Sequence, residues 1–168
     1  MSTTVKTVIF LSLIFLLQAV LQGYIDISPM VQFCLLPMVI AALPYGWKDW
    51  VIMVMSFVIG LMADTISGGV PGINAAACVL DALLSDPVYR RFVSTDNRSA
   101  ASAPTMYNIG KLPYIKFISI LTAAYCILFV FLDRFSLAPF WGNLLRMSTT
   151  FLTSTLLIII FNHFTPQD

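Results

Sequence analysis

The sequence contains no glutamate, and all eight of its acidic residues are Asp. Charged residues make up only 10% of the 168 positions, whereas apolar residues make up 59%. An ordinary soluble domain has about 25% charged and 45–50% apolar residues, so this composition is incompatible with one. The mean hydropathy of +0.90 agrees. We therefore expect an all-α polytopic membrane protein, with residues 1–168 forming a single integral membrane domain.

Residues that build catalytic or metal centres are also scarce. The single His163 has no neighbouring His or Cys, and the three cysteines lie separately inside apolar runs. No nucleotide-binding loop, zinc-binding His pair, nucleophile elbow or paired acid motif is present. We expect no enzyme activity, no cofactor and no metal. A membrane enzyme of lipid or prenyl chemistry is a third hypothesis, which no motif supports. The net charge of +1 gives no sign of a nucleic-acid partner.

Long apolar runs are what the sequence does contain. The second to fourth of them are shorter than the ~20 residues that cross a bilayer as a helix. Pro37 lies inside the second run and predicts a kink there. Six crossings fit the pattern, at about 5–24, 30–43, 50–63, 73–84, 114–132 and 144–161.

Basic residues predict the orientation, because Lys and Arg resist transfer across the membrane. Alternating the six segments places seven basic residues on one side and only Arg134 and Arg146 on the other. Both termini are therefore expected on the cytoplasmic side of the membrane. The seven residues on the cytoplasmic side are Lys6, Lys48, Arg90, Arg91, Arg98, Lys111 and Lys116.

One polar stretch, residues 85–113, is expected to be a cytoplasmic basic loop. Arg90, Arg91 and Arg98 lie in it and would face anionic lipid headgroups or a partner protein. Aromatic rings such as Trp50, Trp141, Tyr89 and Tyr114 fall near the predicted span ends, where membrane proteins place them.

The most distinctive passage joins the third and fourth segments. It contains small residues that favour a tight helix hairpin, together with an acid at the membrane boundary. Asp64 has three possible roles: capping a helix, accepting hydrogen bonds from the amides of the glycine turn, or facing a cavity. The residues of this hairpin motif are Gly60, Asp64, Gly68, Pro71, Gly72 and Asn74.

Further polar residues fall at helical spacing within the apolar segments. Asn74, Cys78 and Asp81 share one helix face, which must point inward. Asp81 would pair with a basic residue such as Arg90 or Arg91, or form a functional site. Gln18 and Gln22 are four residues apart and are expected to face another helix. The hydroxyls of residues 148–155 are expected to bond within their own helix or to a neighbour.

The hairpin passage resembles the MreD family of bacterial rod-shape-determining membrane proteins. That family has a glycine-leucine pair, an acid, a glycine and a second glycine that opens the next helix together with an asparagine and an alanine. The matching stretches here are Gly60-Leu61, Asp64, Gly68 and Gly72-Ile73-Asn74-Ala75. The Gln18 to Gln22 region and the chain length are also similar to the family.

The resemblance implies a non-catalytic subunit of the cell-elongation complex, or elongasome, in the bacterial inner membrane. This subunit regulates cell shape and side-wall peptidoglycan synthesis by binding partner proteins. Its implied partners are an MreC-like bitopic protein and, through it, the MreB filament, the RodA glycosyltransferase and a class B penicillin-binding transpeptidase. The family's fold is similar to the S-components of energy-coupling-factor vitamin transporters. The alternative function is therefore a small-molecule-binding transporter subunit. The available outer-side polar groups are too few to specify a ligand, which favours the non-catalytic subunit; they are Asp26, Asp64, Asn74 and Asp133.

Overall fold

The structure is a computed structural model that describes residues 12–18, 20, 33–43, 48–68, 70–92, 109–134 and 140–163. These residues form helices, with no strand among them, which confirms the all-α class. Residues 12–18 are helical. The other helices are α2 (Leu36–Ala41), α3 (Asp49–Ser67), α4 (Ile73–Phe92), α6 (Lys111–Arg134) and α7 (Phe140–His163).

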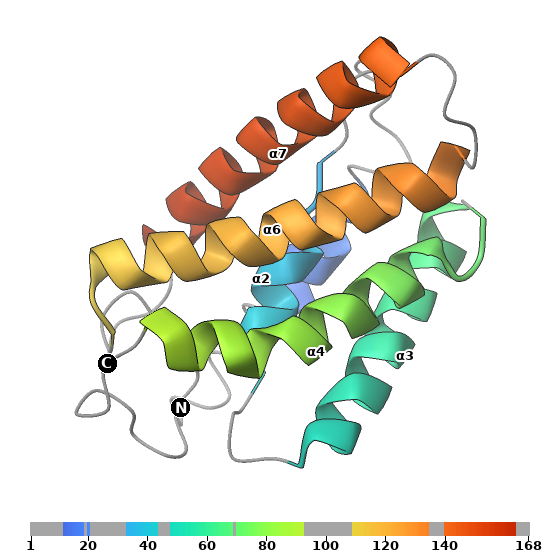
Figure 1. Cartoon of the computed structure of the whole chain (residues 1–168). Coiled ribbons are helices and arrows are strands. Elements are labelled where there is room, and N and C mark those ends of the chain that lie inside the picture. Colours follow the sequence, from blue (N-terminus) through green and yellow to red (C-terminus); the bar gives the residue numbers. More distant parts are fainter. Residues whose placement is uncertain are drawn as a thin grey trace.

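Helix α4 is the centre of the arrangement, because it packs against α3, α6 and α2. In Figure 1, α4 and α6 lie side by side, α7 flanks the other edge of α6, and α3 crosses α4 at a steep angle. The short α2 lies behind α4 and α6. The residues that join α3 to α4 are therefore the turn of a helix hairpin.

Two helices, α3 and α6, are long and apolar enough to cross a membrane. The apolar part of α7 is shorter, at Leu144–Ile160. Helix α4 has 20 residues, which at 1.5 Å per residue reaches about 30 Å, but it also carries two Asp and two Arg. Asn74, Asp81 and Ser85 are buried, whereas Arg90 and Arg91 are exposed in the last turn of the helix.

The second predicted span is wrong as a continuous helix. Residues 33–35 are not helical, and α2 contains only six residues, all buried. At 1.5 Å per residue, six residues reach only about 9 Å of a ~30 Å hydrocarbon core. Pro37 lies at the start of α2, where its missing N–H costs nothing, so it begins the helix instead of kinking it.

Side chains from two other helices satisfy the buried backbone that precedes α2. The Gln18 amide donates to the Phe33 carbonyl at 2.8 Å and accepts from the Leu35 N–H at 2.6 Å. The Cys34 N–H donates to Ser154 Oγ of α7 at 2.9 Å. Gln18 thus faces inward as expected, although its partner is non-helical backbone. Gln22 lies outside the described residues.

The hydroxyls of α7 bond in both expected ways. Ser148, Thr149 and Thr153 donate to carbonyls three or four residues earlier in their own helix. Ser154 instead accepts from the chain before α2. The Ser154 bond joins α7 to another part of the chain, whereas the bonds of Ser148, Thr149 and Thr153 stay within α7.

The predicted basic loop begins later than expected. Helix α4 continues to Phe92 with Pro87 inside it, so residues 85–92 are helical and not loop. Residues 93–108, with Arg98, lie outside the described part of the chain. Tyr89 packs edge-on against Phe117 in the core, and Tyr114 is also buried, so neither ring faces outward from the bundle. Trp50 and Trp141 are exposed, as expected.

Candidate functional site

The two helices of the hairpin touch at Gly60. A Cβ atom at this position would lie 2.5 Å from the Ala75 Cα and 2.7 Å from the Asn74 carbonyl oxygen. These are backbone atoms, so a side chain at residue 60 would push the helices apart. The inward face of α3 consists of Ile52, Ser56, Gly60, Ala63 and Asp64. Small residues on this face allow the backbones to approach closely.

Asp64 caps α4 from the neighbouring helix. Its Oδ2 accepts from the Gly72 N–H at 2.8 Å and the Ala75 N–H at 3.3 Å. Its Oδ1 accepts from the Asn74 N–H at 3.1 Å and the Asn74 side-chain amide at 2.9 Å. The carboxyl group therefore sits at the positive end of the α4 dipole and satisfies amides that a helix start leaves free. Of the three roles expected for Asp64, the structure confirms two: Asp64 caps a helix, and it accepts hydrogen bonds from amides of the glycine turn.

The turn between the helices depends on glycine conformation. Gly68 ends α3 with φ of +66°, and Gly72 precedes α4 with φ of +103°. Residues with a side chain rarely adopt such φ angles, so a substitution would be strained even though open space surrounds both positions. Pro71 is exposed at the tip. Gly68 and Gly72 thus shape the turn, whereas Gly60 serves close packing.

A third helix joins the capping group through Asn74. The Tyr125 hydroxyl of α6 donates to Asn74 Oδ1, so Asp64, Asn74 and Tyr125 form a chain of hydrogen bonds from α3 through α4 to α6. All three side chains are buried. The sequence did not reveal Tyr125, because it lies 51 residues from Asn74. A tyrosine within an apolar run was the only signal.

Asp81 contrasts with Asp64. The predicted face of Asn74, Cys78 and Asp81 does point inward, since all three are buried. The expected pairing of Asp81 with Arg90 or Arg91 is wrong, however, because neither oxygen of Asp81 has a hydrogen-bond partner among the described residues. Asp81 lies two and a half turns before Arg90, on the inward face of α4, whereas Arg90 and Arg91 are exposed.

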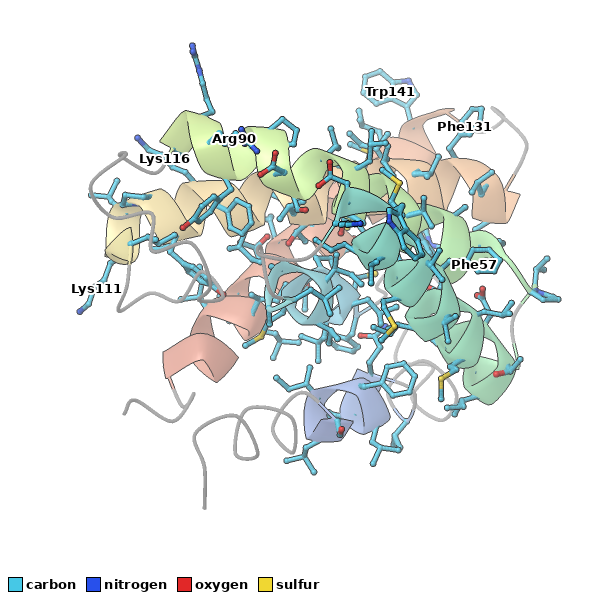
Figure 2. All side chains as sticks on the ribbon, turned by 90° about the horizontal axis from the view of Figure 1, so that it is seen from below. Phe57, Arg90, Lys111, Lys116, Phe131 and Trp141 are labelled. Atoms are coloured by element: carbon cyan, nitrogen blue, oxygen red, sulfur yellow. The ribbon has the colours of Figure 1, made fainter. Side chains whose placement is uncertain are left out.

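Arg90 pairs instead with Asp86, one helical turn earlier, at 2.7 Å. The hydrogen bond to Asp86, then its charge, raises the pKa of Arg90, and Asp49 at the start of α3 adds to this. In Figure 2, Arg90, Lys111 and Lys116 lie at one end of the bundle, and Trp141 and Phe131 lie at the other. These three basic side chains therefore lie at the opposite end of the bundle from Trp141 and Phe131.

The described residues contain no group of three or more His, Cys or acidic side chains arranged to hold a metal ion. Asp133 is engaged by Arg146, whose Nη1 lies 2.8 Å from its Oδ2. Asp26 lies outside the described residues. At the turn of the hairpin, Asp64 and Asn74 bond to each other and to the start of α4.

No protein-family model matches the chain, and neither a curated protein nor a solved structure matches it.

Proposed function

We propose that the chain is an integral membrane protein, on the ground that large apolar side chains cover much of its outside. Its buried side chains include polar ones on every long helix, while large apolar side chains are exposed. Phe57 of α3 and Phe131 of α6 project outward from the bundle (Figure 2). A soluble monomer rarely exposes apolar patches larger than a few hundred Å², whereas lipid solvates them. The exposed face of α3 alone carries Trp50, Val54, Met55, Phe57, Val58, Leu61, Met62 and Ile66.

Within the six-span proposal, α3, α4, α6 and α7 are four crossings. The helical residues 12–18 belong to the first crossing. The second is a broken segment, in which residues 33–35 precede α2 and are shielded from lipid by neighbouring helices. Such irregular backbone is tolerated in a bilayer where protein encloses it. The end that carries Arg90, Lys111 and Lys116 faces the cytoplasm, because basic residues stay on that side.

For the function, we propose a non-catalytic subunit of the cell-elongation complex, similar to the MreD family. The observation that carries this proposal is the internal engagement of the outer-side polar groups. Asp64 and Asn74 bond to each other and to the start of α4, and Asp133 bonds to Arg146. Polar groups that already bond within the protein stabilise its packing and leave few hydrogen-bonding sites for a small ligand. The same observation weakens the alternative of a vitamin-transporter subunit.

In this proposal the chain recognises partners through helix surfaces. Its binding partner in the membrane is an MreC-like bitopic protein, which links it to the MreB filament, the RodA glycosyltransferase and a class B penicillin-binding transpeptidase. The rigid hairpin presents the apolar face of α3 at a fixed angle to α4. A single transmembrane helix packs on such a face through van der Waals contact.

Depletion of the protein in its native host tests this function. We expect depleted cells to lose their rod shape and wild-type protein to restore it. Gly60→Leu, which separates the hairpin helices, should fail to restore it, whereas Leu61→Ile on the outward face should succeed. Purification of the full chain should recover a bitopic periplasmic protein. Rod-shaped depleted cells that lose uptake of a solute, together with a cytoplasmic ATPase pair in the purified complex, would support the transporter instead.

A further inference from the structure

Helix α4 carries one carboxyl group that the packing leaves without a partner. Asp81 is 0% exposed, and neither of its oxygens accepts a hydrogen bond from the described residues. Asp64, on the facing helix, is also buried but accepts four hydrogen bonds. The two acids of the hairpin therefore occupy opposite environments.

The position of Asp81 within the helix explains this difference. Asp64 meets the first turn of α4, where amide groups have no partner within the helix. Asp81 lies nine residues into α4, where each amide already donates to the carbonyl four residues earlier. The backbone around Asp81 thus has no donor left to offer, and only side chains of neighbouring helices can stabilise a negative charge there.

In the part of the chain that the structure describes, no cation is among the titratable groups that act on Asp81. On α4 and α6, the titratable groups within electrostatic range of Asp81 are Cys78, Cys126 and Tyr125. From α3, Asp64 acts on Cys78, and from the chain before α2, Cys34 acts on Tyr125. All of these groups are neutral or acidic.

The enclosure of Asp81 has an energetic consequence. An ionised carboxylate in such surroundings costs several kcal/mol, whereas the neutral acid costs far less. The neutral acid also has an O–H group that donates to a hydroxyl or carbonyl oxygen, which the carboxylate lacks.

We propose that Asp81 is a proton-binding site inside the seam between α3, α4 and α6, and that it holds its proton at neutral pH. The site takes a proton rather than a larger cation, because Asp81 is fully enclosed and the described residues hold no metal-ligating cluster around it. Loss of the proton places a bare charge in the seam and loosens the packing of these helices. This inference is independent of the proposed cellular function.

Proton binding links the stability of the bundle to pH. An Asp side chain in the unfolded chain releases its proton above about pH 4. The folded protein then holds one proton more than the unfolded chain, so its stability falls as the pH rises. The ratio of folded to unfolded protein should fall about tenfold per pH unit relative to a variant that cannot ionise at this position. Asp81→Asn is that variant.

Infrared spectroscopy of the full chain in micelles of an alkyl glycoside detergent, which has no ester carbonyl, tests the proposal directly. Because the sequence has no Glu, every acidic side chain is an Asp, and the carbonyl stretch of a protonated carboxyl has few sources. At pH 7 we expect this band in the wild type and in the control Asp133→Asn, whose carboxylate is paired with Arg146. Asp81→Asn should lack the band. A wild type without the band, or Asp81→Asn that retains it, would overturn the proposal.

Unfolding measured between pH 5 and pH 8 provides the second readout. Asp81→Asn should be more stable than the wild type. Its ratio of folded to unfolded protein, divided by that of the wild type, should grow about tenfold per pH unit. Asp81→Ser should show the same trend if the Asn variant folds poorly. An advantage that does not change with pH would contradict proton binding. Stabilisation of the wild type by sodium chloride but not by choline chloride, with no carboxyl band, would assign the site to a metal ion and also overturn it.

Discussion

The two faces of α3 show opposite chemistry. The inward face carries small or polar residues such as Ser56, Gly60 and Asp64, whereas the outward face carries large apolar ones such as Val54, Val58 and Met62. In water, the large apolar residues would be buried. In lipid, burying them between helices gains little, so association depends on close backbone approach and hydrogen bonds. The inward face supplies both, and changes there should matter most.

Removing the carboxyl group of the inward face should have the largest effect. Asp64→Ala leaves four donors of Gly72, Asn74 and Ala75 without an acceptor. We expect the free energy of unfolding in detergent micelles to fall by about 4 kcal/mol. Asp64→Asn keeps one acceptor oxygen and should lose less. Equal stability of Asp64→Ala and the wild type would show that the cap does not hold the hairpin.

A methyl group at the helix contact should have the next largest effect. Gly60→Ala places a Cβ 2.5 Å from the Ala75 Cα, so the helices must separate. We expect a loss of about 2 kcal/mol in the same unfolding measurement. The outward control is Leu61→Ala, one residue further along α3. If both variants lose the same amount, the two faces of α3 do not differ as described.

The bond from α6 should contribute less. Tyr125→Phe removes the donor to Asn74 Oδ1 and should lower the free energy of unfolding by about 1 kcal/mol. Because Asp64 and Tyr125 both bond to Asn74, the loss should shrink when Asp64→Ala is already present. Losses that simply add would show that the three side chains act independently.

The outward face should tolerate change. Val58→Leu keeps an apolar, exposed side chain, so we expect stability within about 0.5 kcal/mol of the wild type. The measurement is unfolding in the same micelles. A loss as large as that of Gly60→Ala would indicate that this face packs tightly against protein, in contrast to lipid contact.

Local patterns were predictable from the sequence, because helical spacing alone fixes which residues share a face. This is why the inward orientation of Asn74, Cys78 and Asp81, and the capping role of Asp64, could be predicted. Apolar length did not reveal that the second segment is broken. The break depends on Gln18 and Ser154, which satisfy non-helical backbone from distant parts of the chain.

Contacts set by packing were also beyond the sequence. The pairing of Asp81 with Arg90 was a reasonable expectation from charge, but the two residues lie on different faces of α4, and Asp86 is closer to Arg90 in the helix. Nothing in the local sequence places Tyr125 beside Asn74. The position of Tyr125 depends on which helices are neighbours, whereas the Asp86–Arg90 pair follows from a spacing of four residues within α4.

Spin-label accessibility on α3 tests the central claim, which is that its outward face contacts lipid. The label is introduced by Val58→Cys, with Lys48→Cys at the helix start as the aqueous control, and the native Cys34, Cys78 and Cys126 are buried. In nanodiscs, the label at residue 58 should collide more with oxygen than with a water-soluble nickel complex, and the label at residue 48 should show the reverse. Equal access of the nickel complex to both positions would contradict the account.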